Sequence, residues 1–279
     1  MSDILLHLLP SIAACLLYAA LGFHFWHTRW RITDKPLNPL PMQSWERAGI
    51  LMALILQGAS LYEGLFGSGS MRFSFSLALS LMLWLAVLIY WIESFHSRMD
   101  GLQPMVLPPA AACALMPVVF PQAHLIPHAD AWGFKLHFLS AMLAYSLFTL
   151  SALHAAFMGI VGRKLHQREL STQLASLPPI LTMEKLLFRM IAIAFSLLTV
   201  ALGSGVLFSE AIFGKAAPID HKTLFAFASW GIFAALLIGR HAYGWRGRIA
   251  LRWTLTGFMV LLLAYIGSRF VSEVLLGRI

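Results

Sequence analysis

Histidine is the residue type in this chain with the clearest capacity for chemistry. The 279 residues include 11 histidines, nearly as many as the 12 aspartates and glutamates together. An ionisable side chain inside a membrane costs free energy, so each histidine in or beside an apolar stretch is a candidate functional residue. A single histidine near a helix end is more often an interfacial or hydrogen-bonded residue, whereas two at one depth on different helices carry more weight. The candidates are His7, His24, His27, His137, His154, His221 and His241.

His137 and His221 form the strongest pair among them. Each begins or nearly begins an apolar stretch, and the orientation argued below places both near the same membrane surface. Two neutral imidazoles from different helices suit the iron of haem as axial ligands, and neighbouring aromatic rings could pack the flat macrocycle. An ordinary interfacial aromatic belt is the alternative interpretation of those rings. They belong to Trp132, Phe134, Phe138, Phe208, Phe213, Phe225 and Phe227.

His241 belongs to a second, basic group. It follows Arg240 directly, and Trp245, Arg246 and Arg248 come shortly after it. Such a basic rim could hold the carboxylates of haem propionates or the phosphates of anionic lipids. The excess of lysine and arginine in cytoplasmic loops accounts for most of these charges without either ligand.

Signatures of soluble enzymes are absent from the sequence. It contains no Walker loop, no nucleotide-binding glycine fingerprint after a strand, no Gly-x-Ser-x-Gly and no His-Glu-x-x-His. Glu210 and Asp220 could form an acid pair, but no nucleophile accompanies them. Cys15 and Cys113 fall inside apolar stretches, so we interpret them as packing residues and not as a disulfide or zinc ligands.

Long apolar helices must position these residues. Apolar residues make up 59% of the chain, charged residues 11%, and the mean hydropathy is +0.76, whereas a soluble domain is roughly one quarter charged. A helix needs about 20 residues to cross the hydrocarbon core. We therefore predict an all-α polytopic membrane helix bundle, a single transmembrane domain over residues 1–279. Its eight spans are expected near 4–26, 48–66, 73–95, 104–122, 132–161, 186–209, 221–243 and 250–275.

The fourth predicted span differs from the others because it contains five prolines. Proline inside a helix removes a backbone hydrogen bond, so we expect this span to be kinked or partly re-entrant. The prolines are Pro104, Pro108, Pro109, Pro117 and Pro121.

The basic residues predict how the bundle is oriented. With eight spans and the N-terminus outside, 14 of the 20 lysines and arginines fall on the cytoplasmic side. Both termini are then expected on the non-cytoplasmic side. The formal charge of +8 is spread over short runs between apolar stretches and forms no single patch, so nucleic acid is not an expected partner.

Several motifs, most specific over the last 60 residues, carry a family resemblance. They are His221-Lys222-Thr223, Trp230, Arg240-His241, Gly244-Trp245-Arg246-Gly247-Arg248, Gly257-Phe258 and Tyr265-x-Gly267-Ser268-Arg269-Phe270. Earlier pieces are the run from Phe73 to Ser80 with Trp84, and His137-x-x-x-Ala141-x-x-x-Tyr145. Together they resemble the cytochrome c assembly (CcsA-like) membrane family, and within it the YpjD/HemX-like branch most closely.

The resemblance implies haem handling at the outer face of a bacterial inner (plasma) membrane. In synthetase members of the family, a tryptophan-rich loop and two flanking histidines present haem to apocytochrome c. His137 matches the first of these histidines, and His221 is the expected substitute for the second. The corresponding loop, residues 205–220, contains no tryptophan, and no histidine follows the last span. A complete haem-attachment synthetase is therefore not expected, and enzymatic activity stays open.

The same resemblance bears on an inner haem site. Gln57 and Ile238 occupy positions where synthetase members tend to carry transmembrane histidines, and His241 is the expected replacement one turn away. We expect a haem-binding accessory protein with the lipid bilayer, haem and other cytochrome maturation proteins as partners. The alternative is a haem-free membrane scaffold or transport accessory that retains the fold.

Overall fold

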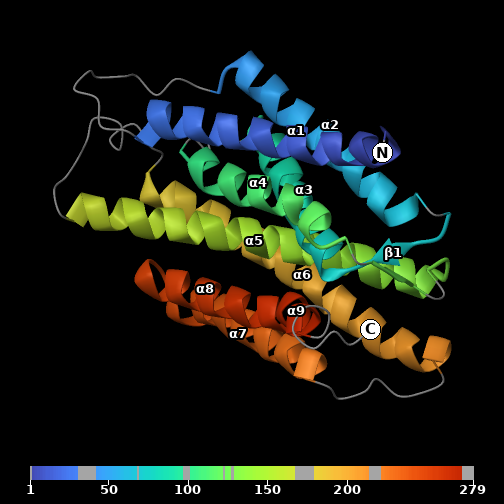
Figure 1. Ribbon diagram of the computed structural model, residues 1–279. Coiled ribbons are helices and arrows are strands. Elements are labelled where there is room, and N and C mark those ends of the chain that lie inside the picture. Colours follow the sequence, from blue (N-terminus) through green and yellow to red (C-terminus); the bar gives the residue numbers. More distant parts are fainter. Residues whose placement is uncertain are drawn as a thin grey trace.

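The protein folds into a bundle of long helices in a computed structural model (Figure 1). The structure describes residues 2–30, 42–67, 69–96, 101–121, 123–126, 129–166, 179–213 and 221–271. In the described residues the main helices are α1 (Ser2–Phe25), α2 (Ser44–Phe66), α3 (Phe75–Glu93), α4 (Gln103–Val119), α5 (Trp132–His166), α6 (Ile180–Phe213), α7 (His221–Tyr243) and α8 (Arg248–Leu262). Short π-helical segments extend α1 as η1 (Trp26–Trp30) and α8 as η3 (Leu263–Gly267), which leads into α9 (Ser268–Phe270).

Six of the described helices are long and apolar enough to cross a membrane. They are α1 with η1, α2, α3, α5, α6 and α7. α4 is an apolar helix of only 17 residues with Pro108, Pro109 and Pro117 inside it. α8 has 15 residues and continues through η3 and α9. An all-α polytopic membrane protein is therefore confirmed. The count of eight spans, the kinked or re-entrant fourth span and the orientation of the termini stay predictions.

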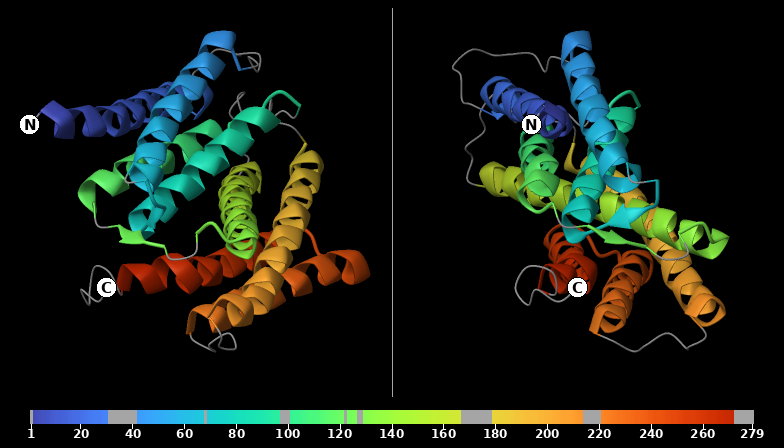
Figure 2. Two further views of the ribbon diagram at one scale, coloured as in Figure 1. Left: turned by 90° about the vertical axis from the view of Figure 1, so that its right-hand side faces the viewer. Right: turned by 45° about the vertical axis from the view of Figure 1, so that its right-hand side comes forward.

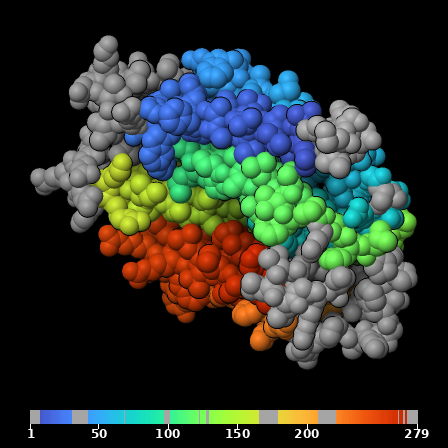
Figure 3. All heavy atoms as spheres, viewed as in Figure 1, coloured from blue at the N-terminus to red at the C-terminus, as the bar shows by residue number. Residues whose placement is uncertain are grey.

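α5 runs through the middle of the bundle. Figures 1 and 2 show α1–α4 on one side of it and α7 with α8 on the other. Phe148 of α5 stacks on Phe233 of α7 with ring centroids 3.9 Å apart, and both rings are fully buried. Gly257 of α8 makes room for this pair, since a Cβ there would lie 2.9 Å from the Phe233 ring. In the space-filling view, α8 lies at the surface between α5 and α7 (Figure 3).

A two-stranded antiparallel ladder joins the loops before α3 and after α4. Its strands are β1 (Arg72–Phe73) and β2 (His124–Leu125), and Phe73 pairs with His124. Strands of two residues are too short to show an alternating pattern, so the sequence contains no signal for them. The ladder lies at the end of the bundle where α5 begins (Figure 1).

The cysteines are packing residues, as predicted. Cys113 is buried, Cys15 is half-buried, and both are free thiols. The possible acid pair cannot be placed, because Asp220 and the side chain of Glu210 lie outside the described residues.

Candidate functional site

His137 is held by the neighbouring helix α6. It lies in the second turn of α5, half-buried, and its Nδ1 is 2.8 Å from the carbonyl oxygen of Ala201. A carbonyl oxygen only accepts hydrogen bonds, so we assign the ring hydrogen to Nδ1, which donates it to Ala201. The other ring nitrogen, Nε2, then carries the free lone pair. This is the tautomer that a histidine needs to bind a metal through Nε2.

Gly205 allows the imidazole of His137 to lie against α6. A Cβ at position 205 would come within 3.1 Å of Cε1 and 3.2 Å of Nδ1 of that ring. Ala201 and Gly205 are one helical turn apart and lie on the same face of α6. The His137 ring therefore contacts the carbonyl oxygen of Ala201 and, one turn later, a glycine that has no side chain to obstruct it. Gly205 therefore serves the contact between α5 and α6.

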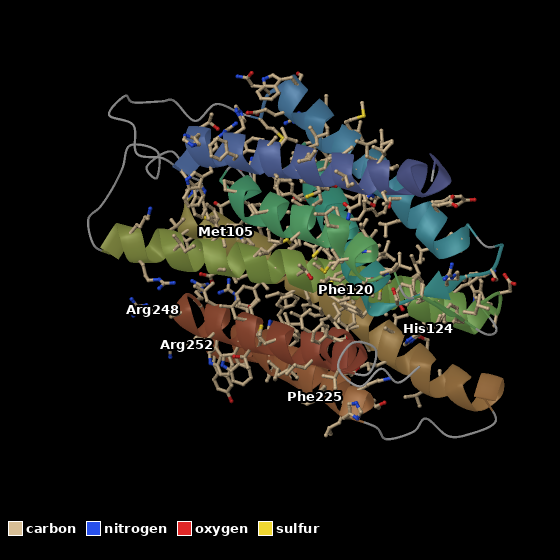
Figure 4. All side chains as sticks on the ribbon, in the orientation of Figure 1. Met105, Phe120, His124, Phe225, Arg248 and Arg252 are labelled. Carbon is tan, nitrogen blue, oxygen red and sulfur yellow. The ribbon has the colours of Figure 1, made fainter. Side chains whose placement is uncertain are left out.

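Three aromatic rings lie together near the beginning of α5. Phe134 and Phe138 stack with centroids 5.8 Å apart, and Phe138 meets Phe73 of β1 edge-to-face at 5.0 Å. Phe73 is the ladder partner of His124, which Figure 4 labels at this end of the bundle. His124 is not among the predicted candidates because it lies between two apolar stretches, and only the β1–β2 pairing brings it toward the aromatic group.

His221 is exposed at the first position of α7. Phe225, one turn later, is labelled on the same segment in Figure 4. No hydrogen bond or ring contact among the described residues joins His221 to His137. The structure thus gives His137 a defined orientation and gives His221 an accessible ring.

His241 is also exposed, and its neighbour Arg240 makes the buried contact. Arg240 donates from Nη1 to Oε1 of Glu184 on α6 over 2.6 Å, and its guanidinium lies 4.6 Å from the centroid of the Phe188 ring. The Glu184 side chain is only 6% exposed. Arg246 lies farther from the same carboxylate, at 3.9 Å. The ion pair therefore anchors the end of α7, while His241 beside it is exposed.

A second buried carboxylate joins the end of α1 to the start of α2. Glu46 is 3.0 Å from Nε2 of His24 and 3.3 Å from a guanidinium nitrogen of Arg29, and it accepts from the backbone N–H of Gln43 over 2.7 Å. This last bond belongs to the capping box that begins α2. Glu46 and Glu184 are not among the residues predicted from the sequence, although each is an acidic residue at the start of an apolar stretch, a signal that could have indicated them.

Gln57 and Ile238 are the two positions that resemble transmembrane histidine sites, and neither side chain offers an imidazole nitrogen to a haem iron. Gln57 is buried, and its Nε2 donates to the carbonyl oxygen of Ser80 over 3.2 Å and lies 3.0 Å from its Oγ. Ile238 is 63% exposed. His154, deeper in α5, is buried with Nε2 3.1 Å from the carbonyl oxygen of Met183, which makes it a contact between α5 and α6.

The described part of the chain contains no group of three or more His, Cys, Asp or Glu side chains placed to hold a metal ion. A structural zinc site needs four such ligands. Haem iron needs only one or two axial ligands, because the macrocycle supplies the others. Single imidazoles such as His137 therefore fit haem iron better than a bare metal ion.

Comparison with known proteins agrees with this architecture. The family model described as cytochrome C assembly protein matches residues 45–276. Inner membrane protein YpjD of Escherichia coli K12 is 27% identical over 240 residues, which are 83% of this chain and 89% of that protein. An uncharacterized 28.8 kDa protein of Azospirillum brasilense is 29% identical over 209 residues, 71% of this chain and 76% of its own length.

A shorter part of the chain is similar to a cytochrome c biogenesis protein. Cytochrome c biogenesis protein CcsA of Prochlorococcus marinus MIT 9215 is 38% identical over 90 residues, 32% of this chain and 29% of that protein. With its six apolar helices of spanning length, the chain is a multi-pass inner membrane protein. Since the family model covers most of its length, it belongs to the cytochrome c assembly protein family.

Proposed function

We propose that this protein binds haem with His137 as an axial ligand and acts as a haem-handling accessory in cytochrome c maturation. The observation that supports this most is the hydrogen bond from His137 Nδ1 to the Ala201 carbonyl. A metal-binding histidine usually donates its second ring N–H to such a partner, which fixes the tautomer and raises the basicity of the ligating nitrogen. Haem supplies an iron centre that accepts such a nitrogen at an axial position.

His221 is the proposed second axial ligand. It comes from a different helix, and its exposure leaves the ring open to a ligand. His241 lies 20 residues farther along α7 than His221, about 30 Å at 1.5 Å per residue. It is therefore the proposed contact of a second, inner haem near the Glu184–Arg240 pair. Among the described residues, neither imidazole has a hydrogen bond of the kind that orients His137, so we expect each to bind haem more weakly than His137 does.

The test is a visible absorption spectrum of the full chain, purified in mild detergent from haem-supplemented cells. We expect a Soret band that His137→Ala weakens strongly and that His221→Ala weakens less or shifts. His96→Ala is the matched control, since His96 is an exposed histidine outside the proposed site, and it should retain the band. A Soret band of full intensity in the His137→Ala protein would refute the proposal.

A haem-free scaffold or transport accessory is the second candidate. Gln57 supports it, because a buried amide bonded to Ser80 stands at a position that resembles a transmembrane histidine site. A purified wild-type protein that is folded and monodisperse but has no Soret band would support this candidate over the first.

A further inference from the structure

Three exposed arginines gather where α7 turns into α8. Arg246 lies in the connecting turn, and Arg248 and Arg252 lie one turn apart in the first part of α8. Residues four apart share a helix face. Figure 4 labels Arg248 and Arg252 at the outer end of α8, where their side chains extend away from the bundle. The cluster therefore points away from the neighbouring helices.

Among the described residues, one carboxylate reaches this cluster. Glu184 lies 3.9 Å from Arg246 but is already paired with Arg240 at 2.6 Å, and no ion pair reaches Arg248 or Arg252 within the described residues. The first turn of α8 contains no acidic residue. Like charges four residues apart on a helix repel one another, so a bound anion would relieve repulsion between Arg248 and Arg252.

The turn that presents the arginines is firmly packed. Trp245 donates its backbone N–H to the Gly239 carbonyl over 3.1 Å, and a Cβ at position 239 would lie 2.4 Å from the Trp245 ring. Trp245 also contacts Trp253 of α8, with ring centroids 5.2 Å apart. Gly247 has φ +56°, a conformation that favours glycine. The arginine backbone is thus held in place before any ligand arrives.

Exposed apolar side chains adjoin the arginines. Tyr243 is 76% exposed and Ile249 is 47% exposed. A soluble anion would gain nothing from them, whereas a phospholipid offers acyl chains beside its phosphate. Arginine binds phosphate oxygens through paired N–H donors. We propose that the α7–α8 corner, defined as Tyr243, Arg246, Arg248, Ile249 and Arg252, binds the phosphate of an acidic phospholipid.

The experiment measures lipid binding by the full chain in mild detergent. The protein is titrated with short-chain phosphatidylglycerol, short-chain phosphatidylcholine or inorganic phosphate, and the rise in melting temperature gives the dissociation constants. We expect phosphatidylglycerol to bind the wild type at least about tenfold more tightly than the other two. In the triple variant Arg246→Gln, Arg248→Gln, Arg252→Gln this affinity should fall at least about tenfold.

The matched control removes three cations from other helices of the bundle. The variant Arg163→Gln, Lys164→Gln, Lys185→Gln loses the same charge outside the corner, and its affinity for phosphatidylglycerol should stay within about twofold of the wild type. Equal weakening in both triple variants would overturn the proposal in favour of general attraction by charge. Inorganic phosphate binding as tightly as phosphatidylglycerol, or phosphatidylcholine doing so, would overturn it as well.

A smaller variant keeps the test decisive if the triple variant does not fold. Arg248→Gln with Arg252→Gln changes only exposed side chains of α8 and should still weaken phosphatidylglycerol binding about threefold or more. A smaller change would overturn the proposal. The corresponding Arg→Lys pair keeps the charge and should bind more tightly than the glutamine pair. None of these measurements depends on haem.

Discussion

Gly205→Ala tests the proposed site at the contact that orients His137. The new methyl carbon would lie 3.1 Å from Cε1 and 3.2 Å from Nδ1, whereas ordinary contact begins at 3.4 Å, so the ring must move by a few tenths of an ångström. That movement strains the 2.8 Å hydrogen bond to Ala201. Loss of such a supporting bond typically lowers metal affinity 10- to 100-fold, and we expect about a tenfold loss of haem affinity.

Gly203→Ala is the control for this change, because it places a methyl group two residues away on the same helix. No atom lies within 4 Å of a Cβ at position 203. Replacing glycine by alanine inside a helix stabilises by about 0.5–1 kcal/mol, whereas overpacking costs about 1–3 kcal/mol. The Gly205→Ala protein should therefore be less stable than the Gly203→Ala protein by about 1–3 kcal/mol.

Two measurements compare these variants. Haem titration of the detergent-purified proteins, followed at the Soret band, gives the relative affinities, and thermal melts of the haem-free forms give the relative stabilities. If both variants bind haem like the wild type and melt together, the structure has the wrong contact at Gly205. If only the haem affinities coincide, His137 packs as described but is not a ligand.

Three further predictions concern the packing of the bundle. Glu184→Gln leaves the partly buried charge of Arg240 without its partner and should destabilise the protein by about 3 kcal/mol, whereas Glu93→Gln, which affects the more exposed pair with Arg189, should cost no more than about 1 kcal/mol in thermal melts. Phe233→Ala removes a fully buried ring stacked on Phe148 and should cost about 3–5 kcal/mol in the same assay, while the half-exposed Phe227 tolerates alanine. Trp84→Phe deletes the indole N–H that donates to the Leu54 carbonyl over 2.7 Å, so it should cost about 1 kcal/mol; an unchanged melting temperature would contradict that bond.

The positions of most helices could be predicted from the sequence alone. The seventh span was predicted at 221–243, which is α7 as observed, and the predicted fifth span begins with α5 at residue 132. Apolar length is a local property, and crossing the hydrocarbon core requires a nearly fixed number of residues, so each span can be recognised without its neighbours. The candidate histidines could be recognised for the same reason, because the sequence alone shows an ionisable side chain within an apolar stretch.

The contact partners of these residues, by contrast, depend on how the helices pack in three dimensions. Ala201 lies 64 positions from His137, and Arg240 lies 56 positions from Glu184. The second pair also explains a misplaced boundary. The sixth span was predicted to begin at 186, after Glu184 and Lys185, whereas α6 begins at Ile180. In the sequence, a carboxylate at this position indicates the end of an apolar span. In the structure, Arg240 of α7 pairs with Glu184, so α6 can include this carboxylate within the bundle.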